Sequence, residues 1–296
     1  MSVGNNPSGI DSGRTLTWRE LLDETIRLIG DRPAARWLCE TACGLEGQEF
    51  LDELKQPATV RMVAHLDSMV QRYRNGEPLA YVLGRWSFRT IEIVVDRRVL
   101  IPRPETEVVA GRAIEFARMS SSSRRVVDLG TGSGAIGLSM AAELPLADTE
   151  VWMTDLSEDA LDVARANATG LGRGAANVRI AQGSWFEALP PHLQGTFDVV
   201  VSNPPYIAKD DDEVEDGVLN WEPHGALFSG DEGLDALRDI IEQAPLWLRS
   251  EGWLIVEIGY RQGGLVSDLM ISAGFEDVRV GNDLTGRDRF VEGRRR

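Results

Sequence analysis

The spacing of hydrophobic residues predicts helices in the first quarter of the chain. Leu22, Ile26 and Ile29 recur at intervals of three and four residues, which places them on one face of a helix. Thr17 and Glu20 have the spacing of a capping box, which favours the start of a helix here. Further helices are predicted to begin near Asp31 and to cover residues 50–54 and 59–73. This part of the chain therefore predicts a small helical bundle.

The pattern divides the N-terminal third into three segments. Residues 1–14 are rich in Gly, Ser and Asn and contain almost nothing apolar, so a disordered tail is expected. The predicted helices make residues 15–78 an N-terminal helical domain. From residue 79 to residue 100 the period changes to two, with Trp86 and Phe88 on one side. Alternation of this kind is typical of strands, and we predict a β-hairpin linker over 79–100.

Beyond residue 100, short apolar runs alternate with helical patterns. The runs predict strands over residues 125–129, 151–155, 178–181, 197–202 and 253–258. Strands separated by helices imply an α/β domain with a parallel, doubly wound sheet over residues 101–296. Such sheets bind ligands beyond the carboxyl ends of their strands. The arginines at 294–296 are expected to fray.

Composition narrows the classes of partner. The 296 residues carry a formal net charge of −16. Because an acidic surface repels phosphate, direct binding of nucleic acid is not expected. No signal sequence or run of about 18 apolar residues is present, so we expect a cytoplasmic protein without a membrane partner. Cys39 and Cys43 have no Cys or His near them in sequence to complete a metal site, and we predict reduced thiols and no metal.

A glycine-rich loop follows the first predicted strand of the sheet. Residues 126–137 read Val-Val-Asp-Leu-Gly-Thr-Gly-Ser-Gly-Ala-Ile-Gly, and the loop opens a predicted helix. Glycines in this place allow a ligand to approach the backbone closely. Gly130, Gly132 and Ala135 also fit the looser fingerprint of dinucleotide binding, so NAD remains an alternative on this pattern alone. A tight strand-to-helix turn without a ligand is the other alternative.

One carboxylate favours S-adenosylmethionine as the cofactor, and a second suits either candidate. Asp128 lies beside the glycine loop, where it can hold a cationic methionine amine but would repel a pyrophosphate. Asp155 ends the next strand, where a carboxylate can accept both ribose hydroxyl protons of either cofactor. The alternative for Asp155 is that it only caps the following helix.

The tetrapeptide Asn-Pro-Pro-Tyr at 203–206 directly follows the fourth predicted strand. The Asn203 side-chain oxygen and the Pro204 carbonyl can each accept one hydrogen of a planar NH₂ group, which orients its nitrogen for methylation. Pro205 stiffens the loop, and Tyr206 can lie against the flat face of the target. Elsewhere the tetrapeptide would be an ordinary rigid turn, but at the end of this strand it is predicted to face the cofactor.

With these residues in place, the chain resembles the release-factor glutamine methyltransferases, the PrmC/HemK family, over nearly everything after Arg14. The shared markers are Gly-Glu-Pro at 76–78 with Tyr81 and Gly84, Ile-Pro-Arg-Pro-Glu-Thr-Glu at 101–107, the loop at 128–134, Asn-Pro-Pro-Tyr at 203–206 and Glu-Pro at 222–223. The resemblance implies a class I methyltransferase fold with a helical N-terminal domain that holds the partner. It also implies N5-methylation of the glutamine in the Gly-Gly-Gln motif of class I peptide chain release factors.

The resemblance also implies the roles of individual residues. Those expected to contact the cofactor are Asp128, Gly130, Thr131, Gly132, Ser133, Gly134, Asp155, Trp185 and Asn203. Those expected to bind the glutamine are Asn203, Pro204, Pro205 and Tyr206, of which Asn203, Pro204 and Tyr206 are expected to be catalytic. Ser184 stands where the family often has an acidic residue that accepts from the adenine amine.

Three rival functions stay open on the sequence. An adenine-N6 or guanine-N2 nucleic-acid methyltransferase is the chief alternative, because two acceptors and an aromatic face also suit an extruded base. The acidic charge argues against it. A non-catalytic adaptor would use only the helical domain, and an NAD-dependent oxidoreductase would need a proton-transfer residue to which nothing in the sequence points.

Overall fold

The computed structural model describes residues 16–120, 123–210 and 216–296. The chain divides into two compact units, with the boundary between Leu83 and Gly84. The predicted disordered tail over 1–14 lies outside the described residues. Among the helices that are described, none has the length and apolar character needed to cross a membrane.

The first unit is helical, as the hydrophobic spacing predicts. Its elements are α1 (Trp18–Ile29), α2 (Arg32–Cys43), α3 (Gly47–Glu53), α4 (Val60–Arg74) and α5 (Leu79–Leu83). The capping box is present, because the Thr17 hydroxyl accepts from the Glu20 amide and the Glu20 carboxylate accepts from the Thr17 amide. Trp18 and Phe50 meet edge to face in the buried core, with ring centroids 5.9 Å apart. Apolar burial by these helices stabilises the unit.

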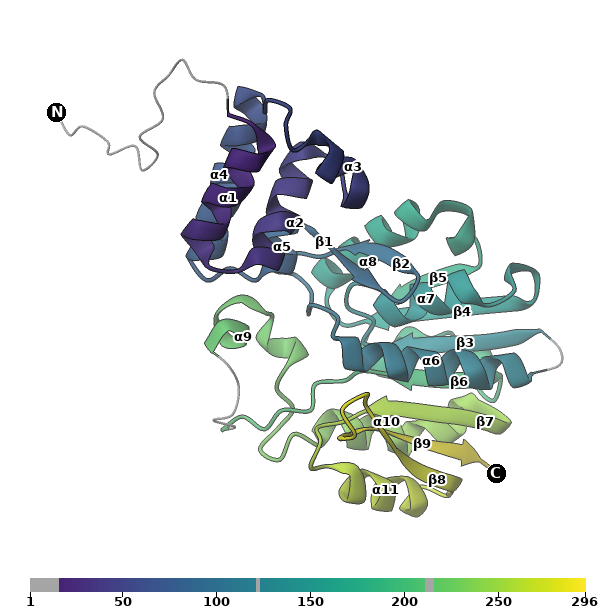
Figure 1. The fold of residues 1–296 in the computed structure, drawn as a ribbon. Coiled ribbons are helices and arrows are strands. Elements are labelled where there is room, and N and C mark those ends of the chain that lie inside the picture. Colours follow the sequence, from purple (N-terminus) through teal and green to yellow (C-terminus); the bar gives the residue numbers. More distant parts are fainter. Residues whose placement is uncertain (1–15, 121–122, 211–215) are drawn as a thin grey trace. The chain divides into compact units, whose positions relative to one another are not determined.

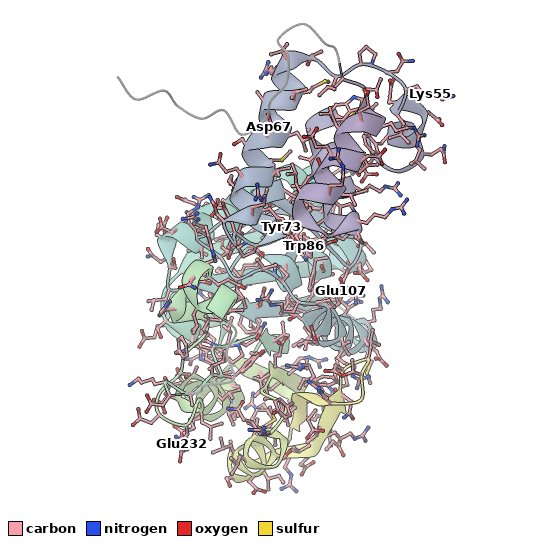
Figure 2. All side chains as sticks on the ribbon, turned by 60° about the vertical axis from the view of Figure 1, so that its left-hand side comes forward. Lys55, Asp67, Tyr73, Trp86, Glu107 and Glu232 are labelled. Carbon is pink, nitrogen blue, oxygen red and sulfur yellow. The ribbon has the colours of Figure 1, made fainter. Side chains whose placement is uncertain are left out.

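Polar contacts in this unit also account for one marker of the resemblance. Glu77 is buried and accepts two hydrogen bonds from Arg72, at 2.8 and 2.7 Å. Arg72 also donates to the carbonyls of Tyr81 and Val82, so one guanidinium joins α4 to α5. Tyr73, labelled in Figure 2, donates its hydroxyl hydrogen to Asp31 at 3.2 Å. The Gly-Glu-Pro marker therefore has a structural function in the helical unit.

Cys39 and Cys43 are free, as expected. Cys39 is fully buried, and burial raises the pKa of its thiol to about 12. Cys43 is partly buried, and its pKa is also raised by burial. These thiols are unreactive as nucleophiles at neutral pH.

The predicted hairpin over 79–100 is shorter than the alternating pattern suggests. Residues 79–83 form the helix α5, and only β1 (Arg85–Phe88) and β2 (Ile91–Val94) pair as antiparallel strands. Gly84 lies between α5 and β1 with a φ of 74°, a conformation that glycine adopts without strain. The prediction of strand structure from residue 79 was wrong, because strict alternation begins only after Gly84.

The second unit is built on a seven-stranded sheet. Its strands are β3 (Arg124–Leu129), β4 (Thr149–Asp155), β5 (Val178–Gln182), β6 (Phe197–Ser202), β7 (Leu248–Glu257), β8 (Phe275–Asn282) and β9 (Asp288–Arg295). They lie in the order β5-β4-β3-β6-β7-β9-β8. The five predicted strands are parallel, which confirms the doubly wound sheet.

The last two strands are antiparallel and were not predicted. β9 lies between β7 and β8 and pairs with both. The expected fraying of the terminal arginines was wrong, since Arg294 pairs with Trp253 in the sheet and forms ion pairs with Glu276 and Asp277. A strand that reads Asp-Arg-Phe-Val-Glu-Gly-Arg-Arg contains too many charges to form an apolar run.

Helices cover the sheet, as Figure 1 shows. They are α6 (Pro104–Met119), α7 (Ala135–Glu143), α8 (Glu158–Leu171), α10 (Asp235–Trp247) and α11 (Gly263–Ser272), whereas α9 (Asp216–Trp221) lies apart from the sheet, in the segment between β6 and α10. Short 3₁₀ helices span Leu146–Asp148, Gly172–Ala175, Trp185–Ala188, Pro191–Leu193 and His224–Ala226. Alternate residues of the strands face one cluster that contains α10 and α11, with Val127, Val200 and Leu254 among its fully buried members. This alternation is why the central strands are apolar at nearly every position.

The register of the sheet aligns the ends of four neighbouring strands. Leu129 of β3 pairs with Thr154 of β4 and with Ser202 of β6, and Ser202 pairs with Val256 of β7. The residues that follow this row are Gly130, Asp155, Asn203 and Glu257. Four polar or flexible positions therefore lie along one edge of the sheet, where ligands bind in folds of this kind.

One side chain joins the hairpin to the glycine loop. Asn167 of α8 is buried, accepts from the Val94 amide at 2.7 Å, and donates to the carbonyls of Val94 and Ser133 at 3.0 and 2.8 Å. A single side-chain amide thus provides hydrogen-bond partners for backbone groups of the hairpin and of the glycine loop, which are 39 residues apart in the sequence.

Replacing Asn167 by Ala should lower the free energy of unfolding by about 2 to 4 kcal/mol, because buried backbone groups lose their partner. Urea denaturation followed by circular dichroism measures the change. The matched control is Gln243→Ala in α10, whose exposed side chain donates only to the Asp239 carbonyl. If both variants unfold at the same urea concentration, the Asn167 contacts do not stabilise the loops.

Candidate functional site

A cavity of about 470 Å³ lies at the aligned strand ends. Of the residues predicted to bind cofactor or substrate, it is lined by Asp128, Gly130, Thr131, Gly132, Ser133, Asp155, Trp185, Asn203 and Pro205. Gly134 and Pro204 are not among its lining residues. The structure thus brings the glycine loop and the Asn-Pro-Pro-Tyr turn to one cavity.

Asp128 is the most deeply buried carboxylate of this cavity. Its Oδ2 accepts from the Thr131 hydroxyl at 2.6 Å and from the Gly137 amide at 2.9 Å, so it holds the loop against the first turn of α7. Its Oδ1 is buried and has no hydrogen-bond partner among the described residues. Burial raises the pKa of Asp128 to about 6. An oxygen in this state can accept from a cationic donor.

Asp155 organises the other side of the loop. Its Oδ2 accepts from the Gly132 amide and its Oδ1 accepts from the Ser157 amide, both at 2.9 Å. The helix α8 is capped by Ser157, whose hydroxyl accepts from Ala160, so the alternative that Asp155 only caps this helix was wrong. Burial raises the pKa of Asp155 as well.

Gly130 and Trp185 are in close contact. Gly130 has a φ of 69°, and a Cβ atom there would lie 3.0 Å from the Trp185 ring. Trp185 itself has a φ of 44°, which is uncommon for a bulky residue. The Trp185 carbonyl accepts from the Thr154 hydroxyl at 3.3 Å. Strain in the backbone is thus maintained at a position where the indole forms part of the cavity wall.

Asn203 lines both this cavity and a second one of about 430 Å³. The Asn203 amide nitrogen donates to the Thr106 hydroxyl at 3.4 Å. Because the nitrogen is directed to Thr106, the side-chain oxygen remains available as an acceptor. Leu100 and Ala226 also line both cavities, and Asn203 is the polar side chain of this shared wall.

Tyr206 lines the second cavity, and both its hydroxyl and its backbone carbonyl form hydrogen bonds. Its hydroxyl donates to Glu257 Oε1 at 3.4 Å, and its carbonyl accepts from Gln262 at 3.0 Å. Gly233 has a φ of 72°, and a Cβ atom there would lie 2.3 Å from the Tyr206 carbonyl oxygen, so only glycine allows this approach. Glu232, labelled in Figure 2, lines the same cavity.

Glu257 was missed by the sequence analysis. It is 1% exposed, lines the second cavity, and has an Oε2 atom without a hydrogen-bond partner among the described residues. Burial raises its pKa to about 7, while hydrogen bonds from Thr106 and Tyr206 oppose the rise. The signal in the sequence that could have identified it is a glutamate directly after the apolar residues 254–256 of a predicted strand.

Two other markers of the resemblance meet beside the cavities. Glu222 is buried, accepts from the Ile101 amide at 3.0 Å, and forms a short ion pair with Arg103. Pro102 lines the first cavity and Arg103 lines the second. The Glu-Pro marker therefore positions the segment that precedes α6.

Comparisons with known proteins identify the family of the chain. A model of the methyltransferase small domain matches residues 109–219, and a model of the PrmC N-terminal domain matches residues 29–84. The release factor glutamine methyltransferase of Xylella fastidiosa (strain Temecula1) is 44% identical over 239 residues, which cover 80% of this chain and 84% of that protein. The chain belongs to the release factor glutamine methyltransferase family.

Other members of the release factor glutamine methyltransferase family are similar over about two thirds or more of this chain. The protein from Burkholderia pseudomallei is 40% identical and covers 88% of this chain and 90% of its own length. A crystal structure described as a release factor-specific protein-(glutamine-N5) methyltransferase from Alicyclobacillus acidocaldarius is 30% identical, with a TM-score of 0.40, and covers 66% of this chain and 94% of that one. The methyltransferase domain match, the sheet order and the curated relatives confirm the predicted class I methyltransferase fold and the family resemblance.

The raised pKa of Glu257 predicts that this residue destabilises the protein at alkaline pH. The ordinary value is 4.5 and the folded value is about 7, so stability falls as pH rises through this interval. Glu257→Gln should therefore raise the free energy of unfolding at pH 8 by up to about 3 kcal/mol and change it little at pH 5. Urea unfolding at both pH values measures the difference.

The matched control for this prediction is Glu292→Gln. Glu292 is equally buried, on the neighbouring strand, but forms a two-pronged ion pair with Arg112. Its replacement should lower stability at pH 8. A loss of stability in Glu257→Gln at pH 8 would contradict the assignment of a strained, ionised carboxylate.

Proposed function

We propose that this protein transfers a methyl group from S-adenosylmethionine to the N5 amide nitrogen of the glutamine in the Gly-Gly-Gln motif of class I release factors. The observation that carries the proposal is the position of Asn203 on the wall shared by two cavities. The glycine loop lies on one side of it and an unfilled space for a side chain lies on the other. A methyl donor and a planar amide can therefore approach each other at this residue.

The residues of the first cavity fit S-adenosylmethionine. The unpartnered Oδ1 of Asp128 suits the methionine ammonium group, and Asp155 can accept from the ribose hydroxyls while its amide contacts hold the loop. The remaining proposed cofactor contacts are Gly130, Thr131, Gly132, Ser133, Gly134, Trp185 and Asn203. The cofactor supplies a methyl group that is electrophilic because it is carried on a positively charged sulfur.

The Asn-Pro-Pro-Tyr turn provides acceptors for the target amide. The free oxygen of Asn203 and the carbonyl of Pro204 would each take one hydrogen of the glutamine NH₂ group. Pro204 and Pro205 limit movement of these acceptors, and the Tyr206 ring would lie against the flat face of the glutamine amide. An amide nitrogen oriented in this way needs no strong base, since its proton can leave after methyl transfer.

The partner is proposed to be a class I release factor, held in part by the helical unit. Relatives at 40% identity or more are named release factor glutamine methyltransferases, and the matched PrmC N-terminal domain covers most of this unit. Their names describe an enzyme that modifies a protein, which agrees with a net charge of −16.

Incubation with labelled S-adenosylmethionine tests the function directly. Purified release factor, DNA and RNA are offered separately, and peptide mass spectrometry locates the methyl group. Label on the Gly-Gly-Gln glutamine supports the proposal. Label in DNA or RNA, with none in release factor, would establish the nucleic-acid alternative instead.

Replacing Asn203 by Ala should reduce the methylation rate at least about a hundredfold, because the target amide loses an acceptor and its orientation. The folded structure should persist, since Asn203 is only partly buried. Methyl transfer at saturating cofactor measures the effect. The control is Asn282→Ala, at an exposed position of β8, which should retain the wild-type rate. A wild-type rate in Asn203→Ala would refute the proposed mechanism.

Asp128→Asn should raise the KM for S-adenosylmethionine about tenfold or more at pH 7.5, because a charge-assisted hydrogen bond is lost. Since the pKa of Asp128 is about 6, the wild-type KM should also rise as pH falls below 6, and the variant should lose this dependence.

Initial rates between pH 5 and pH 8 test the prediction for Asp128. Asp198→Asn is the control, because Asp198 is buried but accepts from Arg125 and Arg249 at the opposite end of β6. It should leave the KM for cofactor unchanged. A pH-independent KM in the wild-type protein would exclude Asp128 as the ammonium partner.

A further inference from the structure

The orientation of the Asn203 amide decides whether it can serve the proposed reaction. Its oxygen must face the target, because the NH₂ group of a glutamine can only donate in the plane of its amide. A half-turn about the last side-chain bond exchanges oxygen and nitrogen with almost no change in shape. Packing therefore cannot select the competent orientation, and a hydrogen-bond partner must do so.

Thr106 is the partner that can select it. Thr106 is buried, lies in the first turn of α6, and its hydroxyl oxygen is 3.4 Å from the Asn203 amide nitrogen. A hydroxyl has one hydrogen to donate and can also accept. If that hydrogen is used elsewhere, only lone pairs face Asn203, and the Asn203 nitrogen is favoured over its oxygen.

Glu257 uses that hydrogen. Interaction with the Thr106 hydroxyl is among the causes that lower the pKa of the Glu257 carboxylate, and this carboxylate can only accept while it is ionised. Tyr206, the last residue of the turn, donates to the same carboxylate at 3.4 Å. Glu257 thus receives hydrogen bonds from α6 and from the Asn-Pro-Pro-Tyr turn.

We propose that Glu257 and Thr106 are positioning residues that fix the Asn203 amide with its oxygen toward the target glutamine. The inference rests on the proposed function and adds two residues to it. In this arrangement the Asn203 amide donates to the Thr106 hydroxyl, and the Thr106 hydroxyl donates to the Glu257 carboxylate. Glu257 acts through Thr106 and has no contact with the cofactor cavity.

The arrangement predicts a pH-sensitive step. When Glu257 is protonated it becomes a donor, the Thr106 hydrogen is released to Asn203, and the amide can turn its oxygen away from the target. The charged or titratable groups near Glu257 are Glu105 on α6, Tyr206 on the turn and Arg289 on β9. Arg289 also forms an ion pair with Asp283 at 3.3 Å, so its charge is shared.

The sign of the effect follows from the ionised state that positioning requires. Because the Glu257 pKa is about 7, kcat at saturating substrates should fall about threefold or more between pH 8 and pH 6. The pKa of Asp128 is similar, but bound S-adenosylmethionine would place its ammonium group beside this carboxylate and lower the pKa. Titration of Asp128 should therefore change the KM for cofactor and leave kcat at saturating cofactor unchanged.

Kinetics of Thr106→Val, Thr106→Ser and Glu257→Gln on purified release factor test the positioning function. Thr106→Val should lower kcat about ten- to a hundredfold, with the KM for cofactor within about twofold of wild type. Thr106→Ser keeps the hydroxyl and should restore kcat to within about threefold. Glu257→Gln should lower kcat at pH 8 and remove the decline between pH 8 and pH 6.

The double variant Thr106→Val with Glu257→Gln separates a shared function from two independent ones. If both residues act through Asn203, its kcat should equal that of Thr106→Val alone. Thr149→Val is the control for the threonine, since Thr149 is buried at the start of β4 with an unpartnered hydroxyl. Glu292→Gln is the control for the glutamate, and both controls should keep the wild-type pH profile.

The proposal is overturned if Thr106→Val retains kcat within about twofold and an unchanged pH profile. If Thr106→Val does not fold, Glu257→Gln decides, and persistence of the decline below pH 8 in that variant overturns the proposal. These outcomes differ from failure of the proposed function, in which the wild-type protein itself would not methylate release factor.

Discussion

The in-register ending of β3, β4, β6 and β7 is the constraint on which the rest of the structure depends. Parallel strands with a common direction leave their carboxyl ends at one edge, and the pairing of Leu129, Thr154, Ser202 and Val256 makes these ends level. A shift of one residue in any strand would turn its buried side chains to the opposite face. The apolar core therefore determines the position of each group in the two cavities.

Three acidic side chains at this edge are withdrawn from water at a cost to stability, Asp128 and Glu257 almost completely and Asp155 in part. Burial raises the pKa of Asp128, Asp155 and Glu257 above ordinary values, so each ionised form is less stable in the folded protein than in water. Elsewhere in the unit, buried carboxylates are matched by arginines, as in the pair of Glu292 with Arg112. The unmatched acids are concentrated at the cavities, which is the pattern expected of a functional site.

The sequence was sufficient for those parts of the fold in which local pattern and tertiary environment agree. The central strands are apolar because helices cover both faces, and the turns after β3 and β6 carry distinctive residues. β8 and β9 were missed because both strands contain many charged residues, and no apolar run marks them. Glu257 was missed because its function depends on Thr106 and Asn203, which lie 151 and 54 residues away by numbering and meet it only through the sheet. A single strand end gives no such information.

The insertion of β9 between β7 and β8 imposes an order on assembly. β8 precedes β9 in the chain but pairs only with it, so residues 275–282 have no place in the sheet until residues 288–295 have been synthesised. Arg289, which approaches Glu257 and lines the second cavity, arrives with that final strand. The glycine loop can form around its neighbours earlier, whereas the cavity for the target amide is completed last.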